Sequence, residues 1–360
     1  TKHNYLVTSV EKLADTIREA FSIAKSGRPG PVLIDVPKDV QTALCEFEAL
    51  PEPAPFMEVP KATDAEIEAA VKLINESKRP YIYIGGGAAG IAAAKAAGNA
   101  KVLLVDRKNA LGGVLLQCTH RGFGKNQTGV EYAGELTKEF PGNVTLAMNT
   151  TVLSVSGDRR AVLSGGPFGR REVSFSQLIL ATGCREIPMG ALPIAGTRPK
   201  GIYTAGQMQE MMNLHGFTPE GPVVILGSGD LGLIMARQLA QIGLSVTMVE
   251  KKSQCGGMAR NQRCLEEYPI RLICGDTIRE IQGYPHITGC VTANGKKLPC
   301  KMLLIAAGLI PERELTSHLG NPDWLHICGN CNVVHPMVEA VVNEGKQAGV
   351  AATEKLGGAL

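Results

Sequence analysis

The sequence predicts an α/β protein in which two strand–turn–helix–strand units build largely parallel, doubly wound sheets, preceded by a partial α/β segment. A buried strand, a glycine-rich turn, a helix of small residues and a second strand follow one another from Pro80 onward, and the same order returns from residue 223. Glycine is abundant, with 42 of 360 residues, in a chain that is 44% hydrophobic and 20% charged. This composition is typical of globular proteins and excludes a disordered or collagen-like chain. At ~150 residues per domain, the length predicts two or three domains.

Charge and cysteine usage narrow the class of protein. The 37 Lys and Arg residues exceed the 34 Asp and Glu residues by only three and are scattered, so we expect no nucleic-acid partner. The longest apolar stretch, 302–310, is far shorter than the ~20 residues that cross a bilayer, and residues 1–4 open no secretory segment. The ten cysteines lie mostly singly, which suits a reducing compartment. We expect a cytoplasmic protein with no membrane span and no metal site.

The first 80 residues predict a separate small segment. Apolar residues at helical spacing predict a helix over 10–25, which Gly27 ends, and a buried strand follows over 31–37. The prolines of 50–55 predict a linker, because proline removes hydrogen-bond donors. A capped helix is expected from residue 63 to Ile74.

The first repeated unit carries a dinucleotide-binding pattern. Strands are expected over 81–84 and 102–105, with a turn over 85–90 and a helix over 91–97 between them. The turn reads Gly85-x-Gly87-x-x-Gly90: the first glycine permits the turn, the second lets the backbone approach a pyrophosphate, and the third lets helix and strand pack closely. Asp106, at the end of the second strand, can accept hydrogen bonds from a ribose. A Gly-rich turn used only for packing is the alternative.

The second unit repeats this pattern. A strand over 223–226 leads into Gly227-x-Gly229-x-x-Gly232, a helix through Leu239 and a strand that ends on Glu250. Two nucleotide sites in one chain suggest electron transfer between them. The Glu250 carboxylate would repel a 2′-phosphate and favour NADH over NADPH, although the adjoining Lys251 and Lys252 weaken that preference.

From about Pro80 to Leu360 the chain resembles the pyridine nucleotide–disulfide oxidoreductase superfamily. It is most similar to the FAD-dependent NAD(P) oxidoreductases that accompany glycerol-3-phosphate and opine-type dehydrogenases. Six ordered stretches carry the resemblance: 84–90, 111–118, 180–186, 225–230, 306–312 and 328–330.

The resemblance implies two interleaved Rossmann-like domains, with FAD in the first and NAD(P)H in the second. The expected bounds are 1–79 for the preceding segment, 80–198 and 301–360 for the FAD domain, and 199–300 for the NAD(P) domain. Residues implied on the FAD side, including the crossovers between domains at 182–183 and 308, are Gly85, Gly87, Ala88, Ala89, Gly90, Asp106, Arg107, Gly112, Gly113, Thr182, Gly183, Gly308, Gly329 and Asn330. Those implied for NAD(P)H are Gly227, Gly229, Asp230, Leu231, Gly232 and Glu250.

The resemblance also implies a flavin environment near the C-terminus. Gly329-Asn330 stands where the wider superfamily has Gly-Asp, which removes a negative charge near the phosphates. A helix is expected to begin at 335–340 with proline in its first turn. Its N-terminus would lie beside the flavin pyrimidine, where its partial positive charge stabilises negative charge on the ring. His335 is a catalytic candidate, with a merely hydrogen-bonded histidine as the alternative.

The cysteines do not form a convincing redox pair. Cys118 stands alone after the Gly-Gly segment, and Cys255 and Cys264 are too far apart for the other motif of the superfamily. Cys328 and Cys331 have redox spacing but coincide with the expected FAD turn. Cys118 remains a candidate on the substrate side of the flavin, with packing as the equal alternative.

The N-terminal segment resembles a different enzyme. Residues 1–7 and 27–40 look like the end of the pyrimidine-binding domain of acetolactate synthase, a thiamine-diphosphate enzyme. The activating glutamate of that family is expected upstream of Thr1, and Gly229-Asp230 is followed by Leu231 rather than completing its diphosphate motif. The join falls within 81–87, a strand and glycine run that both families possess, so a chimera and a natural fusion both remain open.

These observations predict a flavoprotein oxidoreductase that passes hydride from NAD(P)H to FAD and on to an unidentified acceptor, a small molecule or a protein. A homo-oligomer or a companion dehydrogenase subunit is a further partner. The main alternative is a non-catalytic chimera or a partner-dependent electron-transfer subunit, since the segment 314–323 is shorter than the family usually has. Acetolactate synthase activity with thiamine diphosphate is a weaker alternative.

Overall fold

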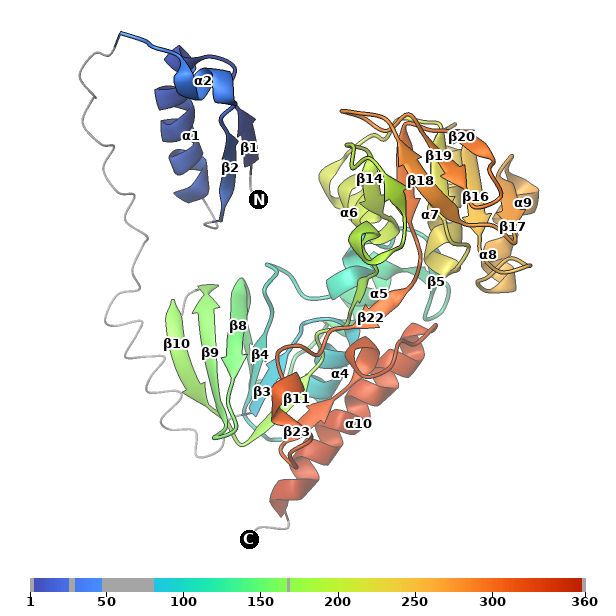
Figure 1. The fold of residues 1–360 in the computed structure, drawn as a ribbon. Coiled ribbons are helices and arrows are strands. Elements are labelled where there is room, and N and C mark those ends of the chain that lie inside the picture. Colours follow the sequence, from blue (N-terminus) through green and yellow to red (C-terminus); the bar gives the residue numbers. More distant parts are fainter. Residues whose placement is uncertain (1–2, 26–29, 47–80, 167–168, 358–360) are drawn as a thin grey trace. The chain divides into compact units, whose positions relative to one another are not determined.

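The chain divides into two compact units, Thr1–Lys61 and Ala62–Leu360 (Figure 1). The computed structural model describes residues 3–25, 30–46, 81–166 and 169–357. Within these ranges, no helix is long and apolar enough to cross a membrane. The predicted linker over 50–55 and the helix expected from residue 63 lie outside the described residues.

The N-terminal unit is a single strand–helix–strand element. Strands β1 (His3–Leu6) and β2 (Val32–Asp35) pair in parallel, and α1 (Leu13–Lys25) connects them. Parallel neighbours need such a crossover, because a tight hairpin can join only antiparallel strands. The predicted helix over 10–25 is therefore correct, except that its first turn is the 3₁₀ helix η1 (Val10–Lys12). A short helix, α2 (Lys38–Thr42), follows β2.

The large unit contains two five-stranded parallel sheets of the same construction. In spatial order the first sheet is β23 (Leu325–Ile327), β11 (Gln177–Leu180), β3 (Tyr81–Ile84), β4 (Val102–Val105) and β7 (Val144–Ala147). The second is β14 (Ile202–Thr204), β21 (Met302–Ile305), β15 (Val223–Leu226), β16 (Val246–Glu250) and β17 (Arg271–Cys274). Thus β3 and β15, the strands that precede the two glycine loops, hold the central place in their sheets, as a doubly wound fold predicts.

We call the part built on the first parallel sheet the first lobe and the part built on the second the second lobe. Each lobe also contains a smaller sheet. The first is antiparallel and consists of β10 (Arg170–Ser174), β9 (Arg160–Gly165) and β8 (Thr150–Val155). The second is mixed: β13 (Ala195–Gly196) pairs in parallel with β18 (Ile278–Gln282), and β19 (Gly289–Thr292) and β20 (Lys297–Pro299) continue the sheet in antiparallel pairing. Two antiparallel strands, β12 (Cys184–Glu186) and β22 (Leu309–Pro311), pair where the chain passes between the lobes.

The helices complete the lobes. They are α4 (Ala88–Ala96), α5 (Gly129–Leu136) and α10 (Val338–Gly357) in the first lobe, and α6 (Ala205–His215), α7 (Asp230–Gln241), α8 (Ala259–Gln262) and α9 (Cys264–Glu267) in the second. The remaining short elements are the strands β5 (Arg121–Phe123) and β6 (Gln127–Thr128) and the 3₁₀ helices η2 (Gly113–Gln117), η4 (Met189–Ala191), η5 (Ser317–Leu319) and η6 (Gly329–Cys331).

The strand pairing corrects one expected domain boundary. A boundary at residue 301 would place 302–305 in the FAD domain, but β21 pairs in parallel with both β14 and β15 of the second sheet. Residues 195–196 likewise pair with β18 of the second lobe, although the expected bound was 199. Strand pairing with β14 and β15 therefore holds 302–305 in the second lobe, and pairing with β18 holds 195–196 there.

Two helix starts also differ from the expectation. Helix α4 begins at Ala88 instead of residue 91, so the last glycine of the first loop lies inside the helix, and extended Gly87 is its N-cap. Helix α10 begins at Val338, so Pro336 precedes the helix rather than occupying its first turn. Both differences arise because the backbone of a loop, unlike hydrophobic spacing, leaves no periodic signal in the sequence.

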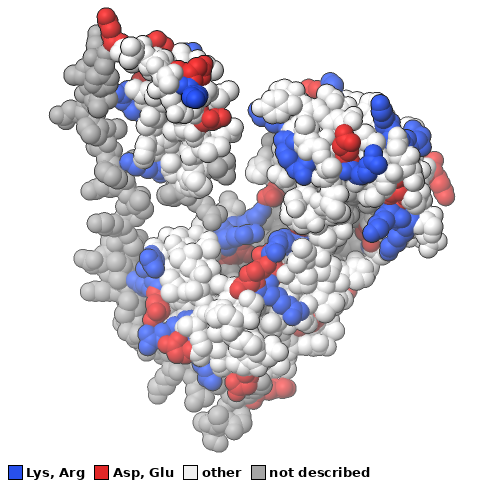
Figure 2. Space-filling model, viewed as in Figure 1, with Lys and Arg blue, Asp and Glu red and all other residues white. Residues whose placement is uncertain are grey.

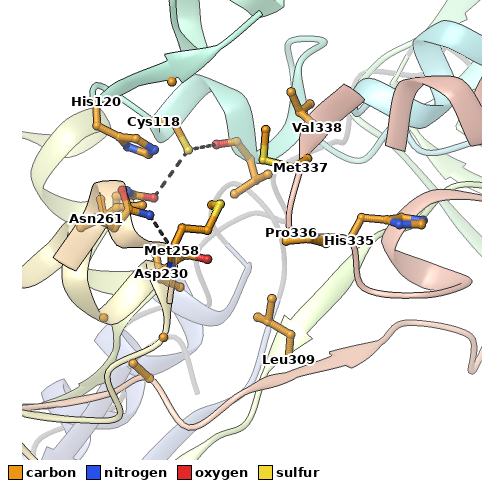
Figure 3. Close-up of a pocket in the computed structure, with 18 of the residues that line it drawn as sticks. Cys118, His120, Asp230, Met258, Asn261, Leu309, His335, Pro336, Met337 and Val338 are labelled. Carbon is orange, nitrogen blue, oxygen red and sulfur yellow. Dashed lines mark hydrogen bonds between the residues drawn. The ribbon is translucent and has the colours of Figure 1, made fainter. Parts of the chain in front are cut away.

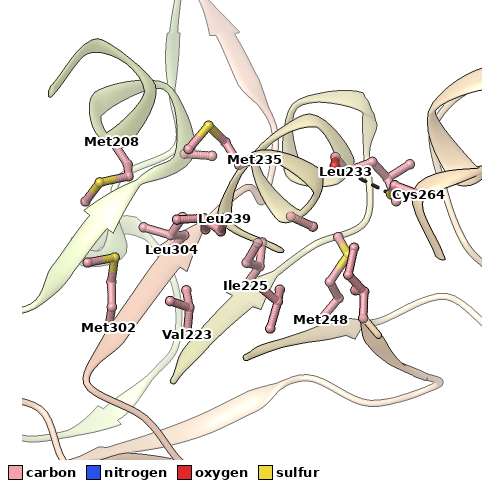
Figure 4. Close-up of a cluster of buried hydrophobic side chains, with 14 residues drawn as sticks. Met208, Val223, Ile225, Leu233, Met235, Leu239, Met248, Cys264, Met302 and Leu304 are labelled. Carbon is pink, nitrogen blue, oxygen red and sulfur yellow. Dashed lines mark hydrogen bonds between the residues drawn. The ribbon is translucent and has the colours of Figure 1, made fainter. Parts of the chain in front are cut away.

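The cores of the lobes are built from different residues. Methionines are prominent in the second lobe, where Met208, Met235 and Met248 are fully buried among aliphatic side chains (Figure 4). In the first lobe, α10 lies along α4 so closely that a Cβ added at Gly345 would meet the Ala89 carbonyl oxygen at 2.3 Å (Figure 1). Small residues at this contact are therefore obligatory.

The surface carries charges of both signs. On the face shown in Figure 2, acidic and basic side chains occur near one another, in keeping with the scattered charge of the sequence.

Candidate functional site

The first glycine loop has one open position between two closed ones. Gly85 has φ +116°, and a Cβ there would lie 2.3 Å from the Ala181 carbonyl oxygen. A Cβ at Gly90 would lie 1.7 Å from the Gly85 carbonyl oxygen, whereas one at Gly87 would meet nothing within 4 Å. The outer glycines are therefore required by packing, and the middle one leaves free space at the N-terminus of α4. Amide groups at such a terminus bind anions.

The second loop repeats this geometry. Gly227 has φ +103°, and its Cβ would lie 2.3 Å from the Ala306 carbonyl oxygen. A Cβ at Gly232 would lie 2.6 Å from the Gly227 carbonyl oxygen, and one at Gly229 would meet nothing within 4 Å. Open space beside the second glycine, at the start of α7, fits the pyrophosphate of a second dinucleotide.

The two predicted ribose acids also support their own loops. One Asp106 oxygen accepts from the Gly86 amide at 2.6 Å and the other from the Lys108 amide at 2.7 Å. One Glu250 oxygen accepts from the Ser228 amide at 2.8 Å and from its hydroxyl at 2.6 Å, and the other accepts from the Lys252 amide at 2.9 Å.

Glu250 is the more deeply held acid, because it is only 8% exposed. Burial alone would raise the pKa of the Glu250 carboxyl, but the hydrogen bonds from Ser228 and Lys252 and the charge of Lys252 outweigh it and keep that pKa below its usual value. Glu250 is therefore ionised at neutral pH.

A cavity of about 510 Å³ lies between the lobes (Figure 3). One wall comes from the second lobe and includes the open Gly229 with Met258 and Asn261. The others come from the first lobe: Cys118 and His120 follow η2, and the segment 334–338 leads into α10. The volume falls within the range of small-molecule sites.

The first glycine loop contacts this cavity's first-lobe wall through η2. Gly112 donates its amide hydrogen to the Gly86 carbonyl oxygen at 2.8 Å, and a Cβ added at Gly113 would lie 3.1 Å from the Gly87 Cα. Both glycines have positive φ, 117° and 55°. The structure thus brings 112–113 against the open position of the first loop, where the sequence analysis expected a pyrophosphate.

One crossover residue, Gly308, lines the cavity. The Thr182 hydroxyl donates to the Glu312 carbonyl oxygen at 2.6 Å, which connects the two crossover segments. Gly183 has φ +78° and open space around its missing Cβ. Ala88 and Ala89 form the first turn of α4, while Arg107 is exposed beyond β4.

Cys118 lines the cavity as a buried thiol. Its Sγ donates to the Val114 carbonyl oxygen at 3.3 Å and lies 3.8 Å from the Gln209 Oε1. Burial raises the pKa of the Cys118 thiol to about 12, so the thiol is protonated at neutral pH and is a poor nucleophile. The structure therefore favours a packing and hydrogen-bonding role for Cys118 between the lobes over a role as a covalent nucleophile.

His335 is placed unfavourably for a catalytic role. Its ring is directed away from Cys118, His120 and Asn261 in Figure 3, and its Nε2 pairs with the Glu344 carboxylate at 2.7 Å. His335 is among the residues that line the cavity, but the pairing with the Glu344 carboxylate on α10 favours the hydrogen-bonded alternative over a catalytic role.

Glu344 is a residue that the sequence analysis missed. It accepts from the Gly329 amide at 2.9 Å, from the Asn332 side-chain amide and from His335, so one carboxylate holds the whole turn before α10. Burial opposes ionisation, but these hydrogen bonds outweigh it and lower the pKa of Glu344. Asn330 closes the same turn, since its Oδ1 accepts from the His335 amide at 3.0 Å. We call this set of hydrogen bonds to Glu344 the Glu344 clamp. It could not be predicted from the sequence, because it follows neither helical nor strand periodicity.

Cys328 and Cys331, the pair with redox spacing, pack in the hydrophobic core of the first lobe. Both are buried free thiols, and the Cys331 Sγ donates to the Leu180 and Cys328 carbonyl oxygens at 3.1 Å. Burial raises the pKa of each thiol. In the described part of the chain, no group of three or more His, Cys, Asp or Glu residues could hold a metal ion.

Asp230 has a structural function beside the second loop. Its Oδ1 accepts from the Met258 amide at 2.8 Å and from the Asn261 side-chain amide at 2.6 Å. It therefore holds the segment 256–261 against the start of α7. This segment was missed because the sequence shows no motif there. Leu231, which the resemblance implies for NAD(P)H binding, lines the cavity.

Two glycine loops of the dinucleotide-binding type, each with an acid at the end of the next strand, define an α/β protein with two dinucleotide sites. The pyridine nucleotide-disulphide oxidoreductase family matches residues 80–322, more than half of the chain. The chain belongs to this family of flavoprotein oxidoreductases, which implies FAD and a pyridine nucleotide. The open positions at Gly87 and Gly229 fit these two groups.

Solved structures show the same fold. Thioredoxin reductase of Lactococcus lactis is similar with a TM-score of 0.63 and 20% identity, over 77% of this chain and 98% of that chain. The T. acidophilum thioredoxin reductase is similar with a TM-score of 0.63 and 18% identity, over 78% of this chain and 99% of that chain. The covalent putidaredoxin reductase–putidaredoxin complex is similar with a TM-score of 0.56 and 19% identity, over 77% of this chain and 75% of that chain.

Curated relatives support the second resemblance. Acetolactate synthase isozyme 1 large subunit of Escherichia coli (strain K12) is 52% identical over 87 residues, and the chloroplastic acetolactate synthase of Arabidopsis thaliana is 50% identical over 91 residues. Each match covers 24% of this chain and only 16% and 14% of the relative. The acetolactate-synthase-like fragment predicted from the sequence is confirmed.

Proposed function

We propose that the large unit passes hydride from NAD(P)H to FAD and then electrons to a second substrate. The observation that supports this most is the cavity itself. The second glycine loop opens on it, and the facing wall includes η2, whose first residue contacts the first glycine loop. A nucleotide on each loop would therefore have its reactive end directed toward the same space.

We assign the FAD phosphates to the open position at Gly87, where the first amides of α4 and the Gly113 backbone converge. Asp106 keeps lone pairs for a ribose beside the two amides that it already binds. FAD, when bound, supplies the two-electron carrier that a polypeptide lacks.

We assign the N-terminus of α10 to electrostatic stabilisation. Val338, the first residue of this helix, lines the cavity, so the positive end of the helix dipole faces it. The Glu344 clamp fixes the turn that aims this terminus. Positive potential at that wall would favour negative charge on a bound flavin.

We propose NADH as the preferred nucleotide. Glu250 lies at the end of β16, where a ribose of the second nucleotide is expected, and its lowered pKa keeps it negatively charged. That charge disfavours a 2′-phosphate. The side chains of Lys251 and Lys252 are exposed and can turn toward solvent.

The acceptor is a protein or a small molecule. The name of one structural neighbour describes a complex of a reductase with putidaredoxin, which supports a protein acceptor for this fold. A companion dehydrogenase subunit or a second copy of the chain is proposed as a further partner, and a reducing, cytoplasmic location is proposed from the ten free cysteines.

An anaerobic titration of the FAD-loaded full chain tests the proposal. We expect NADH to bleach the flavin absorption at lower concentrations than NADPH. Gly229→Ala, which fills the open position, should raise the NADH requirement about tenfold or more, since it blocks phosphate approach. Gly190→Ala, whose Cβ also meets nothing, is the matched control. FAD binding without bleaching by either nucleotide would instead support the non-catalytic subunit.

A further inference from the structure

A second, smaller cavity adjoins the first. It has a volume of about 120 Å³ and lies between residues 119–121 and the side of α7. His120, Arg121, Ile234 and Asn261 line both cavities. The remaining lining residues are Thr119, Leu233, Arg237, Gln238 and Gln241. This volume accommodates a group the size of a carboxylate or phosphate, since a single water needs only ~10–15 Å³.

The lining of this small cavity is cationic. It contains two arginines and a histidine and no carboxylate. Arg121 lies 3.9 Å from Glu131, but no carboxylate of the described residues lies within 4.0 Å of Arg237 or Arg260. Two acids line the larger cavity: Asp230 accepts hydrogen bonds from Met258 and Asn261, and Glu186 accepts one from the Gly206 amide at 2.8 Å.

His120 responds to this positive environment. Burial, followed by the charges of Arg237 and Arg260, lowers the pKa of the His120 ring. Its Nδ1 is buried and has no hydrogen-bond partner. The side-chain nitrogen of Gln209, a residue 1% exposed on the larger cavity, is likewise buried without a partner. Unpartnered buried polar atoms cost about 1–3 kcal/mol each, a cost that a ligand can remove.

We propose that the small cavity around His120 and Arg237 binds the carboxylate or phosphate group of the second substrate, the compound that exchanges electrons with the flavin. The inference rests on the proposed function, because it deepens that function by giving the second substrate an anionic class. Arg237 supplies a guanidinium fork, His120 an N–H donor, and the amides of Gln238, Gln241 and Asn261 further hydrogen bonds.

The position along α7 separates this site from the nucleotide phosphates. The pyrophosphate is assigned to Gly229 at the start of α7, and Arg237 lies seven residues beyond Asp230, or about 10 Å along the helix at 1.5 Å per residue. An anion at Arg237 is therefore beside the helix rather than at its N-terminus. The shared lining residues connect this anion with the cavity that would hold the flavin.

Calorimetric titration of the FAD-loaded full chain with inorganic phosphate, and separately with oxalate, tests the site. We expect millimolar or tighter binding that Arg237→Gln weakens at least about tenfold, because it removes a charged hydrogen-bond donor. Arg279→Gln changes net charge equally on an exposed position of β18 and should bind within about twofold of wild type. Arg237→Lys, which keeps the charge but not the fork, should lie between them.

Three outcomes would overturn the inference. The first is no heat of binding for either anion in wild type, and the second is equal weakening by both glutamine variants. The third is complete displacement of phosphate by saturating NADH, which would give the site to a nucleotide phosphate. Phosphate binding that persists in the presence of saturating NADH would support assignment of the small cavity to the second substrate. Because the heat needs no flavin reduction, a failed hydride transfer would contradict the proposed function and leave the anion site standing.

Discussion

The two lobes contain the same glycine loop but support it with different residues. In the first lobe, the half-buried Asp106 accepts two backbone amides, and Gly113 from η2 packs on the loop. In the second, the nearly buried Glu250 accepts three hydrogen bonds, two of them from Ser228. The space left open at the middle glycine is common to both. The two lobes therefore share the open space at the middle glycine but differ in the residues that support the loop around it.

The clamps beside the loops differ in the same way. In the first lobe, Glu344 on α10 holds the turn before that helix from outside the loop. In the second, Asp230 is itself the first residue of the loop helix and holds the segment 256–261. Asp230, which the resemblance implies for NAD(P)H binding, thus also supports a neighbouring segment in the second lobe. The residue with this supporting role in the first lobe, Glu344, lies far along the chain from the first glycine loop.

The largest expected effect separates packing glycines from ligand-facing ones. Gly85→Ala forces a Cβ within 2.3 Å of a carbonyl oxygen at positive φ, so we expect it to lower the free energy of unfolding by more than about 3 kcal/mol. Gly87→Ala meets no atom and should change stability by less than about 0.5 kcal/mol while weakening FAD retention. Urea unfolding followed by circular dichroism, with flavin content measured separately, checks both. Equal destabilisation by the two variants would contradict this division.

A smaller effect is expected at the acid of the second lobe. Glu250→Gln should cost about 1–3 kcal/mol at pH 7, because a buried donor loses its acceptor. The pKa of Glu250 is lowered in the folded state, so its contribution is present above the unfolded value of ~4.3 and is lost as pH falls through the folded value. Urea unfolding at several pH values should therefore show the difference from wild type shrinking in acid.

Two variants sharpen this comparison of the acids. Asp106→Asn should cost less than Glu250→Gln, because Asp106 is less buried and water can replace lost hydrogen bonds. Glu266→Gln, at an exposed position of α9, serves as the control and should be close to neutral. A difference between wild type and Glu250→Gln that grows in acid would refute the assigned sign.

The smallest effect is expected at Cys118. Since burial raises the pKa of its thiol to about 12, iodoacetamide at pH 8 should label Cys118 more slowly than the exposed Cys45. Cys118→Ala should leave the rate of flavin reduction by NADH within about threefold of wild type. Mass spectrometry of labelled peptides and stopped-flow absorbance measure the two results. Preferential labelling of Cys118 would restore it as a nucleophile.

Much of the parallel framework could be predicted from the sequence. The strands 81–84, 102–105 and 223–226 are observed with the expected bounds, because a short apolar run between glycine turns is typical of a strand buried on both faces. Helix starts could not be predicted as well, since Ala88 and Val338 follow loops without periodicity. The boundary near 301 was misplaced because β21 reads like any buried strand, and only its partners reveal the sheet that it joins.

The sequence by itself determined the family, the two dinucleotide loops and the acids that follow them, since these depend on local spacing along a strand, a turn and a helix. The tertiary structure decided which of the named residues line the cavity between the lobes. It turned His335 toward Glu344 and brought His120 beside Arg237, a residue more than a hundred positions away in the chain. Such pairs are set by the packing of separate lobes, which leaves no mark in the spacing of residues along the chain.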